Sequence, residues 1–234
     1  MDMKVVYKIA RILTLAQLLA AFSLTMLYIY RPDIYPTGGH FAYMLFYLGI
    51  LPLLAYPLQP IVPKFKGKGR DGQRTLAMIF AVVGYVLSVI TCALTGASSA
   101  MWLIALEYLI SGILILVFNK VFHIRISAHG CGSAGPIFLL LYFGLYAPAA
   151  IMAVLTVIAY VSSVKMKRHT VPQLVGGSLV SVLLLGVLVL IFFALLLVCL
   201  VFLDRDSMLL EEGLENVGNL AAIGFVIHQM LKRP

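Results

Sequence analysis

Two histidines in short polar segments are the residues of this chain whose types and spacing could do chemistry. His129 lies in RISAHG, residues 125–130, and His169 lies in RHTVPQ, residues 168–173. Histidine can act as a nucleophile or a general acid near neutral pH, because its ordinary pKa is close to that range. Cationic side chains accompany both histidines, and cations neutralise the charge that spreads over phosphate oxygens during phosphoryl transfer. The two segments therefore indicate phosphate chemistry.

The distance along the chain between the two histidines indicates how they meet. They are 40 residues apart, which allows two antiparallel helices of about 16 residues, each about 24 Å long. The chain would leave one membrane surface after His129, turn tightly near 146–148, and return just before His169. We therefore expect the two histidines to lie together at one surface of a membrane.

The composition predicts that these helices cross a membrane. Hydrophobic residues make up 62% of the 234 residues and charged residues 11%, against about 25% charged residues in a soluble domain. This excludes a soluble globular protein, a disordered chain and a disulfide-rich secreted module. Runs such as 182–203 are long enough to cross the hydrocarbon layer as helices and too long for barrel strands. The predicted fold is all-α, a polytopic transmembrane helical bundle forming a single domain over 1–234.

The apolar runs predict about seven to eight spans. Seven strong runs and one weaker run occupy 9–30, 41–59, 76–97, 101–118, 134–148, 149–164, 174–203 and, more weakly, 216–231. The first run is too long for a signal-peptide core and is interpreted as a retained span. The acidic tail, 204–234, contains either a last span or an interfacial helix.

The positive charges lie on one side of this predicted arrangement. If each run crosses once, the amino terminus and the loops 60–75, 119–133 and 165–173 share one face, which holds 13 of the 17 Lys and Arg residues. The opposite loops contain only Arg31. The positive-inside rule then places the basic face in the cytoplasm and the protein in the cell membrane. Phosphate binding is an alternative reason for the clustering of Lys and Arg on one face. These residues lie in short loops between spans, which argues against a nucleic-acid partner.

The residues around His129 are suited to binding an anion. Ser127 and neighbouring backbone N–H groups could bind phosphate oxygens. Gly130, Gly132 and Gly135 would let the backbone approach a ligand closely. We therefore expect this segment to form one wall of a phosphate site.

The residues after His169 predict the start of a helix. Thr170 is a suitable N-cap, and Pro172 falls in the first turn, where its missing N–H is not needed. A helix start that points at an anion is favourable. Gln173 follows His169 by four residues, so both would share one helix face.

These segments resemble the type-2 phosphatidic acid phosphatase superfamily, also called the lipid phosphate phosphatases. That family carries the motifs K-x6-R-P, P-S-G-H and S-R-x5-H-x3-D, and one branch has K-I-S-x-H and R-x5-H-T-x2-Q. The resemblance covers about residues 60–180. It implies a six-helix phosphatase-like core and hydrolysis, without a metal or other cofactor, of a membrane lipid such as phosphatidate or a polyprenyl diphosphate.

The resemblance also implies roles for individual residues. His169 matches the histidine that attacks phosphorus, and His129 matches the general acid that protonates the leaving oxygen. Ser127 matches the serine that holds a phosphate oxygen. Gln173 stands where the third motif has the aspartate that orients the nucleophile, so we count it with the catalytic residues. The candidate phosphate ligands are seven basic residues from the three loops: Arg74, which looks like the arginine of the first motif, with Arg125, Lys165, Lys167, Arg168, Lys68 and Arg70.

The sequence departs from the family pattern at three positions. Gly67 stands where the first motif has lysine, with a lysine on either side. Ser163 stands where the third motif has arginine, and Lys165 is a substitute of different geometry, since Arg and Lys are not equivalent at a forked phosphate site. Gln173 can orient a histidine but cannot stabilise its positive form as a carboxylate does.

Two other functions are compatible with these patterns. One is a catalytically impaired relative that binds or moves phospholipid, and the other is a small anion or lipid transporter. Glu107 is an acid inside the fourth predicted span, where acids are rare. It is interpreted either as a structural residue, which pairs with a cation or bonds to a neighbouring helix, or as a substrate contact. The three cysteines show no metal or disulfide spacing. The sequence does not indicate an oligomeric state.

Overall fold

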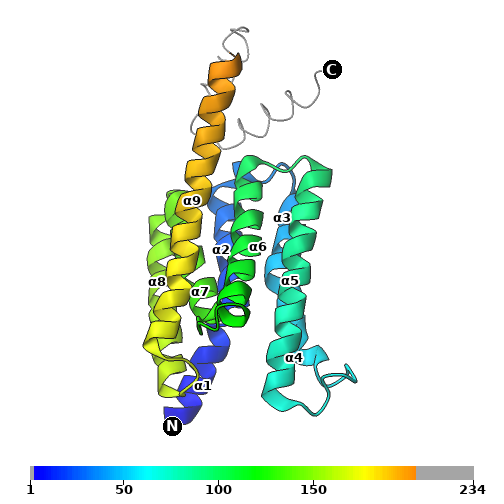
Figure 1. Ribbon diagram of the computed structural model, residues 1–234, viewed down its shortest axis with the longest axis vertical. Coiled ribbons are helices and arrows are strands. Elements are labelled where there is room, and N and C mark those ends of the chain that lie inside the picture. Colours follow the sequence, from blue (N-terminus) through cyan, green and yellow to red (C-terminus); the bar gives the residue numbers. More distant parts are fainter. Residues whose placement is uncertain (1–2, 204–234) are drawn as a thin grey trace.

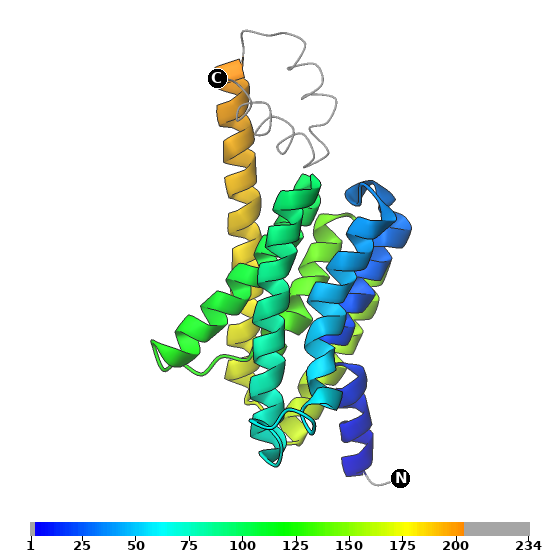
Figure 2. The same cartoon turned by 90° about the vertical axis from the view of Figure 1, so that its right-hand side faces the viewer.

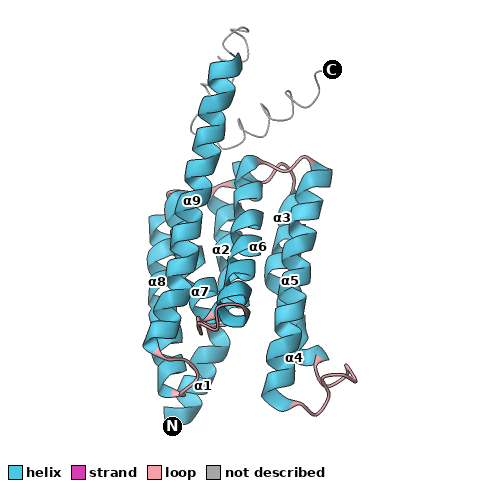
Figure 3. Ribbon diagram, viewed as in Figure 1, coloured by secondary structure: helices cyan, strands magenta, loops and turns pink. Residues whose placement is uncertain are grey.

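The chain forms a bundle of helices joined by loops at its two ends (Figures 1 and 3). The computed structural model describes residues 3–203, and within that range every regular element is helical. In chain order they are α1 (Met3–Leu13), α2 (Ala16–Tyr30), η1 (Pro32–Ile34), α3 (Gly38–Leu45), η2 (Phe46–Ile50), α4 (Leu51–Leu58), α5 (Gly69–Thr95), α6 (Ser99–Lys120), α7 (Ala128–Tyr142), α8 (Tyr146–Lys165) and α9 (Val171–Leu203). The expected all-α fold is confirmed for these residues.

Within residues 3–203, five helical stretches are long and apolar enough to cross a membrane. They are Gly38–Leu58, Asp71–Thr95, Ser99–Lys120, Tyr146–Lys165 and Val171–Val198. The pair α1 and α2, bent by 43°, makes a sixth if the two helices form one broken span. These observations support a membrane protein with several spans.

The larger predicted count of seven to eight spans is not confirmed. α7 has 15 residues, or about 22 Å, and is shorter than a hydrocarbon layer of about 30 Å. It is surrounded by other helices and therefore does not have to be as long as a lipid-exposed span. The predicted run at 216–231, with the rest of the acidic tail, lies outside the described residues.

The loops that carry the basic residues point toward the same end of the bundle. Figure 1 shows the amino terminus, the loop between α4 and α5 and the loop between α8 and α9 at this end, and the loop between α6 and α7 in the same half of the bundle. The predicted clustering of the basic loops on one face is therefore confirmed. We call this the basic end.

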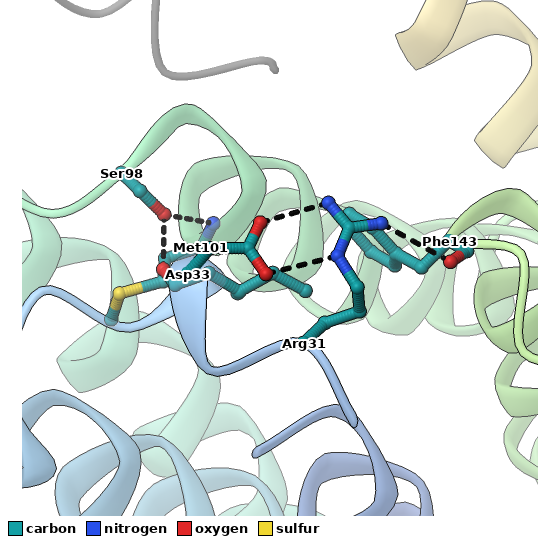
Figure 4. Close-up of polar contacts among 6 residues, drawn as sticks. Arg31, Asp33, Ser98, Met101 and Phe143 are labelled. Atoms are coloured by element: carbon teal, nitrogen blue, oxygen red, sulfur yellow. Dashed lines mark hydrogen bonds and ion pairs between the residues drawn. The ribbon is translucent and has the colours of Figure 1, made fainter. Parts of the chain in front are cut away.

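Polar contacts hold the loops together at the opposite end (Figure 4). Arg31 forms an ion pair with Asp33, at 2.8 Å between Nη2 and Oδ2, and donates a hydrogen bond to the carbonyl of Phe143. Hydrogen bonding to Arg31 lowers the pKa of Asp33. Ser98 caps α6 by accepting from the Met101 N–H, and its hydroxyl donates to the carbonyl of Ile34.

α7 lies inside the bundle and forms its core with the helices around it. It packs against α9, α8 and α2. Leu139 and Leu140 of α7 are fully buried, with Met101 of α6 and Met152 of α8. Figure 2 shows α9 continuing beyond the ends of the other helices. The starts of α7 and α9, beside which the two histidines lie, are thus anchored to this core.

Candidate active site

His129 and His169 lie side by side at the basic end. Their ring centroids are 6.4 Å apart, and the ring planes are inclined by only 13°. His129 comes from the first turn of α7, and His169 comes from the loop between α8 and α9. The prediction that two antiparallel helices bring these residues together is confirmed.

The end of α8 fixes the loop that carries His169. The Lys167 N–H donates to the carbonyl of Val164, and the Arg168 N–H donates to the carbonyl of Ser163. This is the Schellman pattern of a helix C-terminus, and it needs a left-handed residue after the cap. Lys167 takes that conformation, with φ of 52°. The turn therefore reverses the chain within a few residues and places His169 directly after it.

The start of α9 fixes the other side of this loop. The side-chain carbonyl of Gln173 accepts a hydrogen bond from the Thr170 N–H at 3.2 Å, which is half of a capping box. α9 begins at Val171, with Pro172 in its first turn, as expected. Gln173 lines the cavity described below, but its side-chain carbonyl is hydrogen-bonded to the backbone. Its role in orienting His169 stays a prediction.

Ser127 fixes the start of α7 and with it His129. Its Oγ accepts from the Gly130 N–H at 3.1 Å, so Ser127 is the N-cap of α7. The loop before it is held by Asn119, whose side-chain amide exchanges two hydrogen bonds with the backbone of Ile126. Ser127 is buried and is not among the residues that line the cavity. Its role as a phosphate ligand stays a prediction.

Two glycines let the starts of α7 and α9 approach each other. A β-carbon at Gly177 would overlap the carbonyl oxygen of Ser127, and one at Gly130 would come within 2.5 Å of the carbonyl oxygen of Leu174. The Ser127 N–H donates to the carbonyl of Gln173 at 2.9 Å across the same contact. Gly130 was expected to let the backbone approach a ligand; it meets a neighbouring helix instead.

The histidine pair lies on the wall of a large cavity. The cavity has a volume of about 1680 Å³ and is lined by residues from most helices of the bundle. Its lining includes both histidines and several of the cationic side chains of the basic end. Deeper in the bundle its walls are largely apolar, with residues such as Leu53, Val82 and Leu139. The cavity therefore joins a cationic end to a region suited to hydrocarbon.

The structure brings some of the predicted phosphate ligands into this cavity and leaves others out. Arg74, Arg125 and Arg168 line it. Lys68 and Lys165 do not, because Lys68 precedes α5 on the exterior and Lys165 ends α8 before the Schellman turn. The side chain of Arg70 lies outside the described part of the chain.

Sequence reasoning did not select three further basic residues of the cavity wall. Lys8 and Arg11 come from α1, and Lys120 comes from the end of α6. The sequence could have indicated a basic face on α1, because Lys4, Lys8 and Arg11 are spaced by four and three residues, as on one face of a helix. The bend between α1 and α2 carries this face to the cavity, and the sequence gives no direct sign of such a bend.

Burial determines the electrostatics of His129. Burial, and then the nearby charges of His169 and Arg11, lower the pKa of His129 to about 4. His129 lies at the start of α7, outside the candidate spans. Its Nε2 has no hydrogen-bond partner among the described residues. Without a ligand His129 is therefore neutral at pH 7, and a bound anion would favour its protonated form.

Glu107 lies deeper in the same cavity. The residue is 4% exposed, and its Oε2 has no hydrogen-bond partner within residues 3–203. In that part of the chain the only ion pair is the one between Arg31 and Asp33. The interpretation of Glu107 as the structural partner of a cation is therefore not supported. The described residues also hold no group of three His, Cys, Asp or Glu side chains placed to bind a metal ion.

Comparison of the chain with protein-family models, with curated proteins and with solved structures found no match in any of the three.

Proposed function

We propose that the protein is an integral-membrane phosphatase that hydrolyses a lipid phosphate or diphosphate through a phosphohistidine on His169. One observation carries the proposal: His129 and His169 are adjacent at the cationic end of a cavity whose other walls are largely apolar. A phosphate group would lie at the cationic end, and the lipid chain would extend along the apolar walls. Such a division suits an amphipathic substrate taken from the bilayer.

The first chemical step transfers the phosphoryl group to the protein. A ring nitrogen of His169 attacks phosphorus, the N–P bond forms, and the bond from phosphorus to the lipid oxygen breaks. That oxygen takes a proton from His129 and leaves as an alcohol, or as a lipid monophosphate when the substrate is a diphosphate. The bound anion supplies the negative charge that His129 needs to hold this proton.

The second step releases phosphate. Water attacks phosphorus, the N–P bond to His169 breaks, and inorganic phosphate leaves. The water gives a proton back to His129, which restores the acid for the next turnover. A covalent intermediate of this kind replaces one difficult hydrolysis step with two easier steps.

The basic residues of the cavity wall would hold the phosphate oxygens. Arg74, Arg125 and Arg168 approach from three different segments, as a clamp on a transferring phosphoryl group requires. Arg168 is adjacent to His169, and we assign it the function that the family's third motif gives to an arginine. Ser163, which stands at that motif position, is fully buried and is not part of the cavity lining.

The proposed location follows from the charge asymmetry. The protein would lie in the cell membrane with its basic end in the cytoplasm. The substrate would reach the cavity from the lipid leaflet on that side. Polyprenyl diphosphates and phosphatidate are both compatible with a phosphate site next to hydrocarbon.

The test is phosphate release by the purified full chain in detergent. The panel contains a short and a long polyprenyl diphosphate, phosphatidate and lysophosphatidate, with EDTA present. We expect release from at least one lipid, loss of release in His169→Ala, and normal release in His40→Ala, a histidine at the opposite end. Labelled substrate should leave an acid-labile phosphate on the wild type. Release that persists in His169→Ala would refute the nucleophile assignment.

A lipid-binding relative without catalysis is the second candidate. It is favoured by one observation, that the arginine position of the third motif is occupied by the buried Ser163. This candidate predicts that the folded protein retains phospholipid through purification and releases no phosphate from any lipid of the panel.

A further inference from the structure

A second polar cluster lies inside the cavity, away from the histidines. Glu107 and Ser111 belong to α6, and Ser181 belongs to α9; all three line the cavity. The hydroxyls of the two serines donate to backbone carbonyls of their own helices, and both serines also lie within hydrogen-bonding reach of the Cys131 thiol of α7. Glu107 is almost completely buried, and its Oε2 is unpartnered among the described residues.

Gly135 of α7 leaves space at this cluster. An added β-carbon there would lie 3.9 Å from Oε1 of Glu107 and 3.7 Å from Oγ of Ser181. With the β-carbon of Ser181 at 3.4 Å, these are ordinary contact distances, so the space beside Gly135 fits one atom of methyl size and is bordered by polar atoms from two helices. A buried polar group without a partner is costly, and this cluster is therefore incomplete without one.

Helix α7 gives the distance of the cluster from the histidine pair. His129 and Gly135 belong to the same helix and are six residues apart, or about 9 Å along its axis. An extended chain advances about 1.2 Å per bond, so 9 Å corresponds to roughly seven bonds from a phosphorus atom held at His129. This is the distance at which ester, amide or hydroxyl groups occur in lipids that join phosphate to their chains through a polar linker. A polyprenyl chain has only hydrocarbon there.

We propose that Glu107, Ser111 and Ser181 form a second subsite that binds the hydrogen-bonding linker of a lipid phosphate. The inference rests on the proposed function, because the phosphate position sets the distance. It names the substrate class: a lipid with a polar linker is preferred to one with a pure hydrocarbon chain. A site that is built to hydrogen-bond a substrate group discriminates against analogues that lack the group.

The experiment compares phosphate release from two monophosphates in detergent, a diacylglycerol phosphate and a branched alkyl phosphate of similar chain length. The wild type should prefer the ester lipid by about tenfold or more in kcat/KM. Glu107→Leu should reduce that ratio to within about twofold of unity, mainly by slowing the ester lipid. Val83→Ala alters an exposed apolar residue of α5 that does not line the cavity, and it should keep the wild-type ratio.

A second variant tests the subsite in case Glu107→Leu does not fold. Gly135→Ala adds one methyl group to the open space with no contact under 3.4 Å, and it should lower the preference for the ester lipid while the thermal unfolding temperature stays near that of the wild type. An unchanged ratio in both Glu107→Leu and Gly135→Ala would overturn the subsite, as would a wild-type ratio near one.

The subsite and the proposed function can fail separately. If no lipid releases phosphate, the phosphatase proposal fails, and retention of the same two lipids is measured by native mass spectrometry. Preferential retention of the ester lipid by the wild type and not by Glu107→Leu would support the subsite in a lipid-binding protein. Equal retention of both lipids would refute it.

Discussion

Gly177 of α9 packs directly against the backbone carbonyl of Ser127 at the start of α7. A β-carbon at position 177 would overlap that oxygen. Because Ser127 caps the helix that carries His129, and α9 begins two residues after His169, this contact sets the distance between the two histidines.

Replacing Gly177 with alanine should therefore push α7 and α9 apart. We expect a loss of stability of about 1–3 kcal/mol, as for overpacking of a close contact, and a larger loss of phosphate release. Thermal unfolding in detergent and the release assay provide the measurements. Gly186→Ala is the matched control on the same helix, because a β-carbon there meets nothing within 4 Å. Equal behaviour of the two variants would show that the close contact does not position the histidines.

Arg74 and Lys68 are both predicted phosphate ligands at the start of α5, but only Arg74 lines the cavity. Arg74→Gln should raise KM or lower kcat/KM by about 10- to 100-fold, the range for a lost hydrogen bond to a charged group. Lys68→Gln should change either constant by less than about twofold. The kinetic constants of the two variants, measured on one lipid substrate, check this. A stronger effect at Lys68 would contradict the placement of the phosphate.

The lowered pKa of His129 predicts a pH dependence of stability. The fold favours neutral His129, with a pKa of about 4, whereas the unfolded chain binds this proton near pH 6.5. Stability should therefore be full above pH 6.5 and decrease as the pH falls from 6.5 to 4. Thermal unfolding at several pH values should show a shallower decrease in His129→Gln than in the wild type. Added inorganic phosphate should also reduce the decrease, because a bound anion favours the protonated form. Parallel curves for wild type and variant would contradict the assignment.

The proposed orientation can be tested with two single cysteines. Lys68 lies at the basic end and Gly38 at the opposite end, and both positions are exposed. Cys92 and Cys131 are buried, and Cys199→Ser removes the remaining thiol. In intact cells an impermeant thiol reagent should label Gly38→Cys directly and Lys68→Cys only after permeabilisation. The reverse pattern would place the phosphate site on the outer face.

The helical fold and the meeting of the two histidines could be predicted from the sequence because both depend on simple distances. Apolar runs of about twenty residues specify helices in a bilayer, and 40 residues between His129 and His169 specify a return to the same surface. The pattern of Thr170 and Pro172 was likewise enough to locate the start of α9. These features are local or follow from chain length.

The lining of the cavity could not be predicted in the same way. Whether a basic residue faces the cavity depends on helix rotation and on bends, such as the one that brings Lys8 and Arg11 to the site. Lys165 was selected by its position in a motif, but the Schellman turn after it directs Arg168 to the cavity instead. The packing of Gly130 against α9 could not be predicted either. A glycine that lets another helix approach and a glycine that lets a ligand approach cannot be distinguished in a sequence.

α9 is longer than an ordinary bilayer requires. Its 33 residues extend about 50 Å, and a helix longer than the hydrocarbon layer adapts by tilting, by bending or by thickening the lipid around it. It packs against α7 and α6, and its later part continues beyond the ends of the other helices (Figure 2). We therefore expect adaptation to membrane thickness to fall on this projecting part, which lies at the far end of α9 from the histidine pair.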